Sequence, residues 1–277
     1  MLFENVSRIA VSDQIQRREA IKSILQERQI PFKIQRSRQG RHDVENIIIT
    51  FGDTDKYIVF GAHYDSVEGS TGANDNASGV SILIELAACL RTSNATGIEI
   101  VFFDREETDD HGSIAYIDYR GKEKIACMMN LDMCGFGDLM WMVSKFNINN
   151  PIFGSLLRQE VIDRHDIFYI NKVPFRIGDD ESFDEAGIPN VTIETIAFEE
   201  RSLAEAIGKA IEEGNGIPNE LRQRMRTTIS ATTYHNAIND NISFVNEKCM
   251  TNVLDYLLDG LNLPIACKRS GKAAHTL

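Results

Sequence analysis

Short, uninterrupted apolar runs recur along the chain and predict β-strands. Each run is four to seven residues long and rich in β-branched or aromatic side chains, as YIVF at 57–60 illustrates. Such runs are typical of strands that are buried on both faces of a sheet. Predicted strands occupy residues 46–51, 57–60, 98–103, 125–131, 139–143 and 191–196.

Helical patterns alternate with these runs. In residues 13–29, apolar positions such as Ile21 and Leu25 recur at near-helical spacing, and Pro31 follows as a stop. Further helices are predicted over 77–91, 112–120, 151–165 and 245–261. The alternation favours an α/β fold with a mixed, mostly parallel sheet flanked by helices on both faces. In such folds, ligands bind at the carboxyl ends of the strands.

The chain shows no internal repeat and no Pro-rich or Gly/Ser-rich linker, so residues 1–277 are expected to form a single domain. Residues 198–226 do not continue the strand and helix alternation. They contain two predicted helices broken at the sequence GNGIP. This segment is a candidate solvated hairpin, helical insertion, lid or oligomer contact. The sequence leaves the oligomeric state open, and a homo-oligomer is one of the alternatives.

Composition and charge narrow the classes of partner. A formal net charge of −12 argues against nucleic acid and anionic membranes, which bind clustered Lys and Arg. No secretory signal and no apolar run of 18 residues is visible, which predicts a soluble, cytoplasmic protein. The five cysteines are widely spaced and include no CxxC pair. They are therefore expected to be reduced thiols and not disulfides or zinc ligands.

Carboxylate and imidazole side chains gather just after the predicted strands. The group comprises His63, Asp65, Asp75, Glu106, Glu107, Asp132 and, before the last helix, His235. Such ligands suit divalent zinc, cobalt or manganese, and two adjacent cations need roughly five protein groups, one of them a bridging carboxylate. In the dyad of Glu106 and Glu107, one carboxylate can then ligate a metal while the other acts as a base.

Each of these residues also has a structural interpretation. A Glu-Glu pair is commonly a solvated surface element, and a single histidine at a strand end is commonly a hydrogen-bonded structural residue. Asp75 lies in GANDNASG, where an aspartate can simply cap the following helix. Taken singly, these motifs are therefore weak indicators of chemistry.

The order of the motifs is more specific. HYDS, GANDNASG, FFDREE, NLDMCG and YH follow one another, with Asp75 twelve residues after His63. This series resembles the co-catalytic di-zinc aminopeptidases, family twenty-eight of the metallopeptidases, which also includes glutaminyl cyclases and some carboxypeptidases. The resemblance covers roughly residues 44–262, and the short spacing favours the single-domain members.

The resemblance implies a role for each metal ligand. His63 and Asp132 would hold one ion, Glu107 and His235 the other, and Asp75 would bridge the two. The site would thus take two divalent ions, zinc first, with cobalt or manganese as alternatives.

The same resemblance implies the catalytic roles. Glu106 would act as general base on a metal-bridging water, and Asp65 would support His63 by orienting its imidazole. Asp179 matches an aspartate of the substrate side of the cleft, and Tyr234 is a candidate donor to the oxyanion. The peptide bond after Asp75 is often cis in this family.

Some positions depart from the family pattern. Gly178 and Asp180 stand where serine and histidine are usual. Asn236 and Asn239 replace a threonine and an aspartate after His235, with Asp240 one step later. These departures put the substrate contacts and the support of His235 in doubt.

The sequence therefore predicts a zinc-dependent exopeptidase that acts on peptides, most simply an aminopeptidase. One alternative is an aminoacyltransferase of the glutaminyl cyclase type, which would use one zinc ion. Others are a carboxypeptidase or another amide hydrolase on the same fold, and a binding or scaffold protein without activity.

Overall fold

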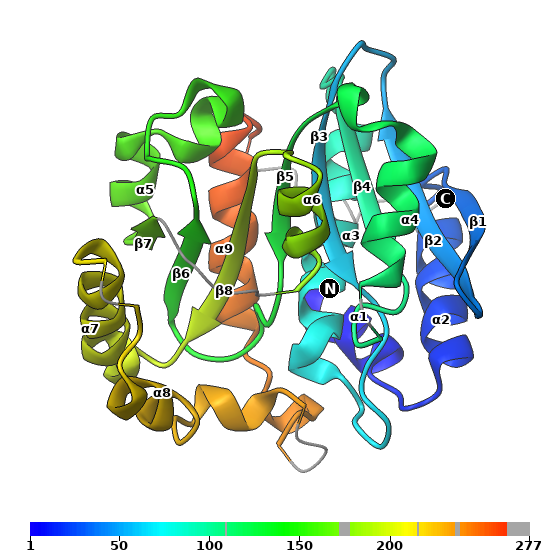
Figure 1. Ribbon diagram of the computed structural model, residues 1–277. Coiled ribbons are helices and arrows are strands. Elements are labelled where there is room, and N and C mark those ends of the chain that lie inside the picture. The colour runs from blue at the N-terminus through cyan, green and yellow to red at the C-terminus, as the bar shows by residue number, and fades with distance from the viewer. Residues whose placement is uncertain (109, 172–177, 215, 236–238, 265–277) are drawn as a thin grey trace.

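The structure is a computed structural model that describes residues 1–108, 110–171, 178–214, 216–235 and 239–264. These residues form an eight-stranded sheet with the order β1-β2-β4-β3-β5-β8-β6-β7 (Figure 1). The strands are β1 (Lys33–Gln39), β2 (His42–Phe51), β3 (Tyr57–His63), β4 (Ile98–Phe103), β5 (Ile125–Leu131), β6 (Leu139–Ser144), β7 (Phe168–Asn171) and β8 (Asn190–Ile196).

The centre of the sheet is parallel. Strand β3 pairs in parallel with both β4 and β5, and β5 pairs in parallel with β8. Antiparallel pairs join β1 to β2, β2 to β4 and β6 to β8. This arrangement confirms the predicted mixed, mostly parallel sheet, and it brings the carboxyl ends of β3, β4, β5 and β8 to one edge.

Helices cover both faces of the sheet (Figure 1). They are α1 (Leu2–Ile9), α2 (Gln14–Glu27), α3 (Gly79–Arg91), α4 (His111–Arg120), α5 (Gln159–Arg164), α6 (Asp180–Glu185), α7 (Arg201–Glu212), α8 (Asn219–Met225) and α9 (Glu247–Gly260). No helix in these described ranges is both long and apolar enough to cross a bilayer.

Strand β3 shows why the central apolar runs are uninterrupted. Val59 and Phe60 are adjacent and fully buried, yet they belong to separate core clusters. Phe60 packs in the cluster of α1, α2, α3 and α9, and Val59 in the cluster of α4 and α6. Successive side chains of a strand point to opposite faces, so a strand covered on both sides needs apolar residues at every position.

Residues 198–226 form the predicted broken helical pair, α7 and α8. Helix α7 packs on the sheet, where Leu203 and Ile207 join a third buried cluster with Trp141 of β6 and Ile196 of β8. Helix α7 is therefore part of the core on this side of the sheet, whereas α8 buries no residue.

Two expectations about the elements were incomplete or wrong. The single helix predicted over 151–165 is a 3₁₀ segment, η3 (Pro151–Leu157), followed by the separate helix α5. Gly154 interrupts it with φ 56 and ψ −130, a left-handed backbone conformation that no helix contains. The strands β1 and β7 and the helices α1 and α6 were not predicted. Strand β1 reads KIQRSRQ and buries only one residue, because it lies at an edge of the sheet.

The cysteines agree with the expectation of reduced thiols. Cys89, Cys127, Cys134 and Cys249 are buried, and none of them forms a disulfide bond in the described part of the chain. Cys267 lies outside the described residues.

Candidate metal centre and cavity

The side chains that follow the central parallel strands meet at one edge of the sheet. His63 is the last residue of β3, and Asp132 directly follows β5. Glu106 and Glu107 lie in the turn after β4. Asp75 lies in η1 (Ala73–Ser78), a single turn of π-helix that leads into α3, and its peptide bond to Asn76 is cis.

Short distances connect this group. His63 Nε2 lies 3.1 Å from Asp75 Oδ1, 3.4 Å from Asp132 Oδ1 and 3.9 Å from Glu106 Oε2. His235 Nε2 lies 2.8 Å from Glu107 Oε2, and its side chain is 57% exposed. The structure thus brings the sequence-predicted ligands together around a buried histidine, with His235 on the open side.

The donor atoms fit a divalent cation. His63, Asp75 and Glu107 each offer one ligand atom within 4.8 Å of the others. Both ring nitrogens of His63, Oε1 of Glu107 and Oδ1 of Asp132 are buried without a hydrogen-bond partner among the described residues. Buried polar atoms normally have partners, and imidazole nitrogens with carboxylate oxygens are the ligands that zinc, cobalt and manganese accept.

The electrostatics of the group also indicate missing positive charge. Burial raises the pKa of Glu106 to about 10, with Asp132 and Asp179 adding to the effect and His63 opposing it. Burial lowers the pKa of His63, but the surrounding carboxylates outweigh this and raise it well above its usual range. Carboxylates crowded in a buried site shift towards protonation unless a cation balances them.

Asp65 acts on the backbone of the acidic dyad. Its carboxylate accepts hydrogen bonds from the backbone N–H groups of Glu106 at 3.0 Å and Glu107 at 3.2 Å. Its Oδ1 lies 3.5 Å from His63 Nδ1, which is longer than a normal hydrogen bond. The predicted support of His63 remains a prediction, and the hydrogen bonds to the dyad are a contact that the sequence did not indicate.

Asp240 anchors the segment that carries Asp75. Its Oδ1 accepts hydrogen bonds from the backbone N–H groups of Asn74 at 2.7 Å and Asp75 at 3.2 Å. Its Oδ2 accepts a hydrogen bond from Ser70 Oγ at 2.8 Å. Sequence comparison had placed Asp240 next to the expected support of His235, whereas the structure connects it to the loop on the other side of the site. Asn236 lies outside the described residues.

Arg17 of α2 lies fully buried beneath the same loop. Its guanidinium donates to the carbonyl oxygens of Tyr64 at 2.5 Å, Thr71 at 2.5 Å and Gly72 at 3.1 Å. It thereby ties together the two ends of the loop between His63 and Asp75. The sequence contained one signal for this role, since Arg17 precedes Ile21 by four residues and so lies on the apolar face of its helix.

Gly178 closes the site from the opposite side. Its φ is 128, and a Cβ added there would lie 2.9 Å from Glu106 Oε1 and 3.2 Å from Asp132 Oδ2. The serine expected at this position would therefore displace the Glu106 carboxylate. The next residue, Asp179, is buried with neither carboxylate oxygen hydrogen-bonded to a described residue, and burial raises its pKa well above the usual range.

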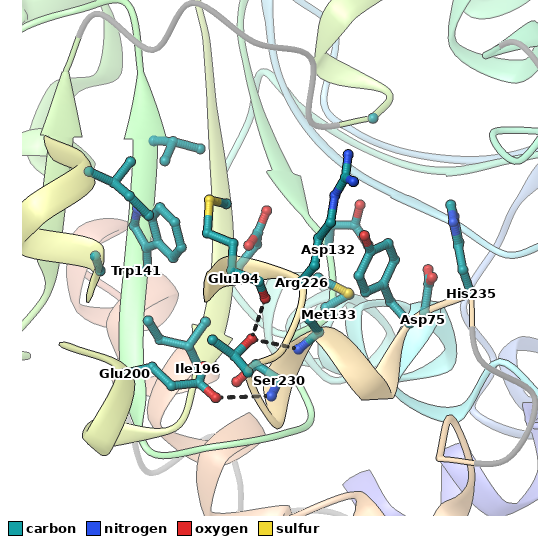
Figure 2. Close-up of a pocket in the computed structure, with 18 of the residues that line it drawn as sticks. Asp75, Asp132, Met133, Trp141, Glu194, Ile196, Glu200, Arg226, Ser230 and His235 are labelled. Carbon is teal, nitrogen blue, oxygen red and sulfur yellow. Dashed lines mark hydrogen bonds between the residues drawn. The ribbon is translucent and has the colours of Figure 1, made fainter. Parts of the chain in front are cut away.

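A cavity of about 610 Å³ opens beside these residues. Figure 2 shows the cluster residues Asp75, Asp132 and His235 on one side and Trp141 on the other. Helices α7 and α8 contribute part of the lining, so residues 198–226 border the site. Tyr234 also lines the cavity, with its ring centroid 4.7 Å from that of His235.

One acid of the cavity was not foreseen from the sequence. Glu194 of β8 lines it, although it lies within an apolar run that predicts an ordinary buried strand. Burial, together with the nearby acids Asp132, Asp180 and Asp75, raises the pKa of Glu194 to about 8.

Comparisons with known sequences agree with this geometry. A model of peptidase family M28 matches residues 46–260. Aminopeptidase YwaD of Bacillus subtilis is 40% identical over 78 residues, which are 27% of this chain and 17% of that protein. The probable leucine aminopeptidase 2 of Aspergillus oryzae is 27% identical over 168 residues, which are 56% of this chain and 34% of that protein. The chain therefore spans less than half the length of the curated relatives it matches.

Solved structures share the fold. A glutaminyl cyclase of Porphyromonas gingivalis has a TM-score of 0.65 at 17% identity, covering 94% of this chain and 96% of that one. BSAP, a zinc aminopeptidase from Bacillus subtilis, has a TM-score of 0.57 at 22% identity, covering 78% of this chain and 49% of that one. At these identities the likeness shows a common architecture.

Proposed function

Because the chain belongs to peptidase family M28, we propose that it is a metal-dependent aminopeptidase that removes N-terminal residues from peptides. One observation carries the proposal. Glu106, an acid of strongly raised pKa, lies 3.9 Å from His63 within a cluster of orphaned ligand atoms that opens on a cavity of about 610 Å³.

The cluster supplies the ligands for the metal. His63, Asp132, Glu107 and His235 would hold two divalent ions, with Asp75 between them and zinc as the first expectation. When bound, the ions polarise the scissile carbonyl and lower the pKa of water.

The protein residues handle the proton and the positioning. Glu106 takes a proton from the attacking water and returns it to the leaving amine nitrogen as the C–N bond breaks. Asp65 holds Glu106 through its backbone N–H, which lies 3.0 Å from the Asp65 carboxylate. Tyr234 lines the cavity beside His235, and this position supports its proposed role as a hydrogen-bond donor to the developing oxyanion.

An assay with aminoacyl-p-nitroanilides in the presence of zinc, cobalt or manganese tests the proposal. The wild type should release p-nitroaniline from free but not from N-acetylated substrates. Cleavage of blocked peptides from their carboxyl end would indicate a carboxypeptidase instead. No turnover with any metal would favour a binding protein.

The variant Glu106→Gln tests the role of the base. It should bind metal as the wild type does and lose nearly all turnover, because an amide cannot accept the proton. The exposed Glu123→Gln serves as the matched control and should keep full activity. Unchanged turnover in metal-loaded Glu106→Gln would rule out the assigned role.

A second candidate is cyclisation of N-terminal glutamine with release of ammonia. The glutaminyl cyclase of Porphyromonas gingivalis matches nearly the whole length of this chain, and the tight group of His63, Asp75 and Glu107 suffices for one ion. Glutaminyl peptides separate the candidates, since a cyclase releases ammonia without shortening the peptide. Two metal ions per chain would support the peptidase and one the cyclase.

A further inference from the structure

We propose that Glu194 is the anionic group that binds a primary ammonium group of the substrate. The inference rests on the proposed peptidase function and extends it to the chemical class of substrate that the cavity selects.

The register of the strands fixes the place of Glu194. Leu131 of β5 and Ile193 of β8 are partners in a parallel pair, so the residues that follow them, Asp132 and Glu194, lie next to each other. On the other side, Trp141 of β6 is the register partner of Glu194. Glu194 thus stands between Asp132 of the metal cluster and the apolar wall of the cavity, which includes Trp141 and Ile196 (Figure 2).

The carboxylate of Glu194 has no counter-ion in the described part of the chain. It forms neither a hydrogen bond nor an ion pair there, and the charged groups that act on it are the acids Asp132, Asp180 and Asp75. Two arginines line the same cavity, but both are exposed, and Arg222 Nε donates to the carbonyl oxygen of Ile217. A carboxylate that borders a cavity without a partner is costly unless a ligand brings positive charge to it.

An aminopeptidase substrate carries such a charge next to its reacting bond. The α-ammonium nitrogen is bonded to the Cα atom that carries the scissile carbonyl. It must therefore lie close to the metal cluster, while the substrate side chain extends along the apolar wall. A lysine side chain is a second source of the same group. A primary ammonium matches an acid placed between these two regions, whereas an acidic side chain would be repelled.

Steady-state kinetics of Glu194→Gln test the inference and separate the two sources. With leucine and lysine p-nitroanilides, a bound α-ammonium predicts that KM rises for both substrates by roughly 10- to 100-fold, with little change in kcat. A bound lysine side chain predicts that KM rises for the lysine substrate alone. Unchanged KM for both would overturn the inference. Glu199→Gln, an exposed acid of the same region, should leave both values unchanged.

A second measurement does not depend on turnover. Calorimetry should show that n-pentylamine binds the wild type more tightly than 1-pentanol does and that Glu194→Gln abolishes this preference. Equal binding of both by the wild type would overturn the inference even if the variant failed to fold. If the wild type hydrolyses no anilide, the proposed function fails while amine binding still tests Glu194. If it hydrolyses them and Glu194→Gln changes neither measurement, the inference alone fails.

Discussion

Asp240 accepts a hydrogen bond from the backbone N–H of Asp75 at 3.2 Å, across 165 residues of sequence. The same carboxylate also accepts the N–H of Asn74 and the hydroxyl of Ser70. The acid proposed to bridge the metals therefore has its backbone fixed by a second buried acid.

Asp240→Ala should weaken metal binding by roughly 10- to 100-fold, as loss of a supporting contact typically does, because the segment of Asp75 loses its anchor. Asp240→Asn should lose much less, since an amide oxygen can still accept the two N–H groups. Competition with a chromophoric chelator measures both. Equal affinity in Asp240→Ala, or the same loss in the exposed control Asp55→Asn, would contradict the anchoring role.

Gly178→Ser should reduce turnover by at least about 10-fold, although serine is the residue expected there from the resemblance. The added Cβ would lie 2.9 Å from Glu106 Oε1, and φ of 128 is strained for any residue except glycine. Gly187→Ser also replaces a glycine of positive φ, but it meets no neighbour within 4 Å and should leave kcat intact. Full activity of Gly178→Ser would show that the Glu106 carboxylate can move away from the added Cβ without loss of turnover, which would contradict this prediction.

Much of the site followed from the apolar pattern. The runs 57–60, 98–103 and 125–131 are almost entirely apolar, with Glu99 and Asn130 as the exceptions, because both faces of β3, β4 and β5 are covered. Once these strands are parallel neighbours, the polar residues after them must meet at one edge, which is how His63 and Asp132 come together. Local sequence was sufficient for these two residues because His63 ends β3 and Asp132 directly follows β5.

Other parts depend on contacts between distant segments. The spacing of Arg17 from Ile21 places it on the apolar face of α2, but only the packing of the distant loop of Thr71 shows which carbonyl oxygens it binds. Glu194 sits in an apolar run, and only the pairing of β8 with β5 and β6 shows that it faces the cavity. The prediction of a single helix over 151–165 was wrong because the apolar residues around Gly154 keep a helical spacing. The interruption is visible only in the backbone of Gly154, whose φ is 56.

The buried thiol of Cys127 should make stability depend on pH. Burial raises its pKa to about 12, so it stays neutral in the folded protein, while in the unfolded chain it ionises above about pH 8.5. The unfolded state therefore gains stability as pH rises. Between pH 7.5 and 9.5, the wild type should lose roughly 1 kcal/mol more free energy of unfolding than Cys127→Ala, measured by urea denaturation. A gap between the two proteins that is independent of pH would contradict this.

Arg17→Met should destabilise the protein by about 3 kcal/mol, because three buried carbonyl oxygens lose their donor and water cannot replace it. Arg17 is 0% exposed and donates to the carbonyls of Tyr64, Thr71 and Gly72. Its neighbour Arg18 is the matched control: its side chain is 21% exposed and pairs with Glu45 at 2.9 Å. Arg18→Met should cost less than about 1 kcal/mol, as surface ion pairs do. Urea denaturation of the metal-free proteins gives both values. The loop that Arg17 binds joins His63 to Asp75, so Arg17→Met should also bind metal more weakly, whereas Arg18→Met should not. Equal losses of stability in the two variants would mean that Arg17 acts through general packing and not through its three carbonyl contacts.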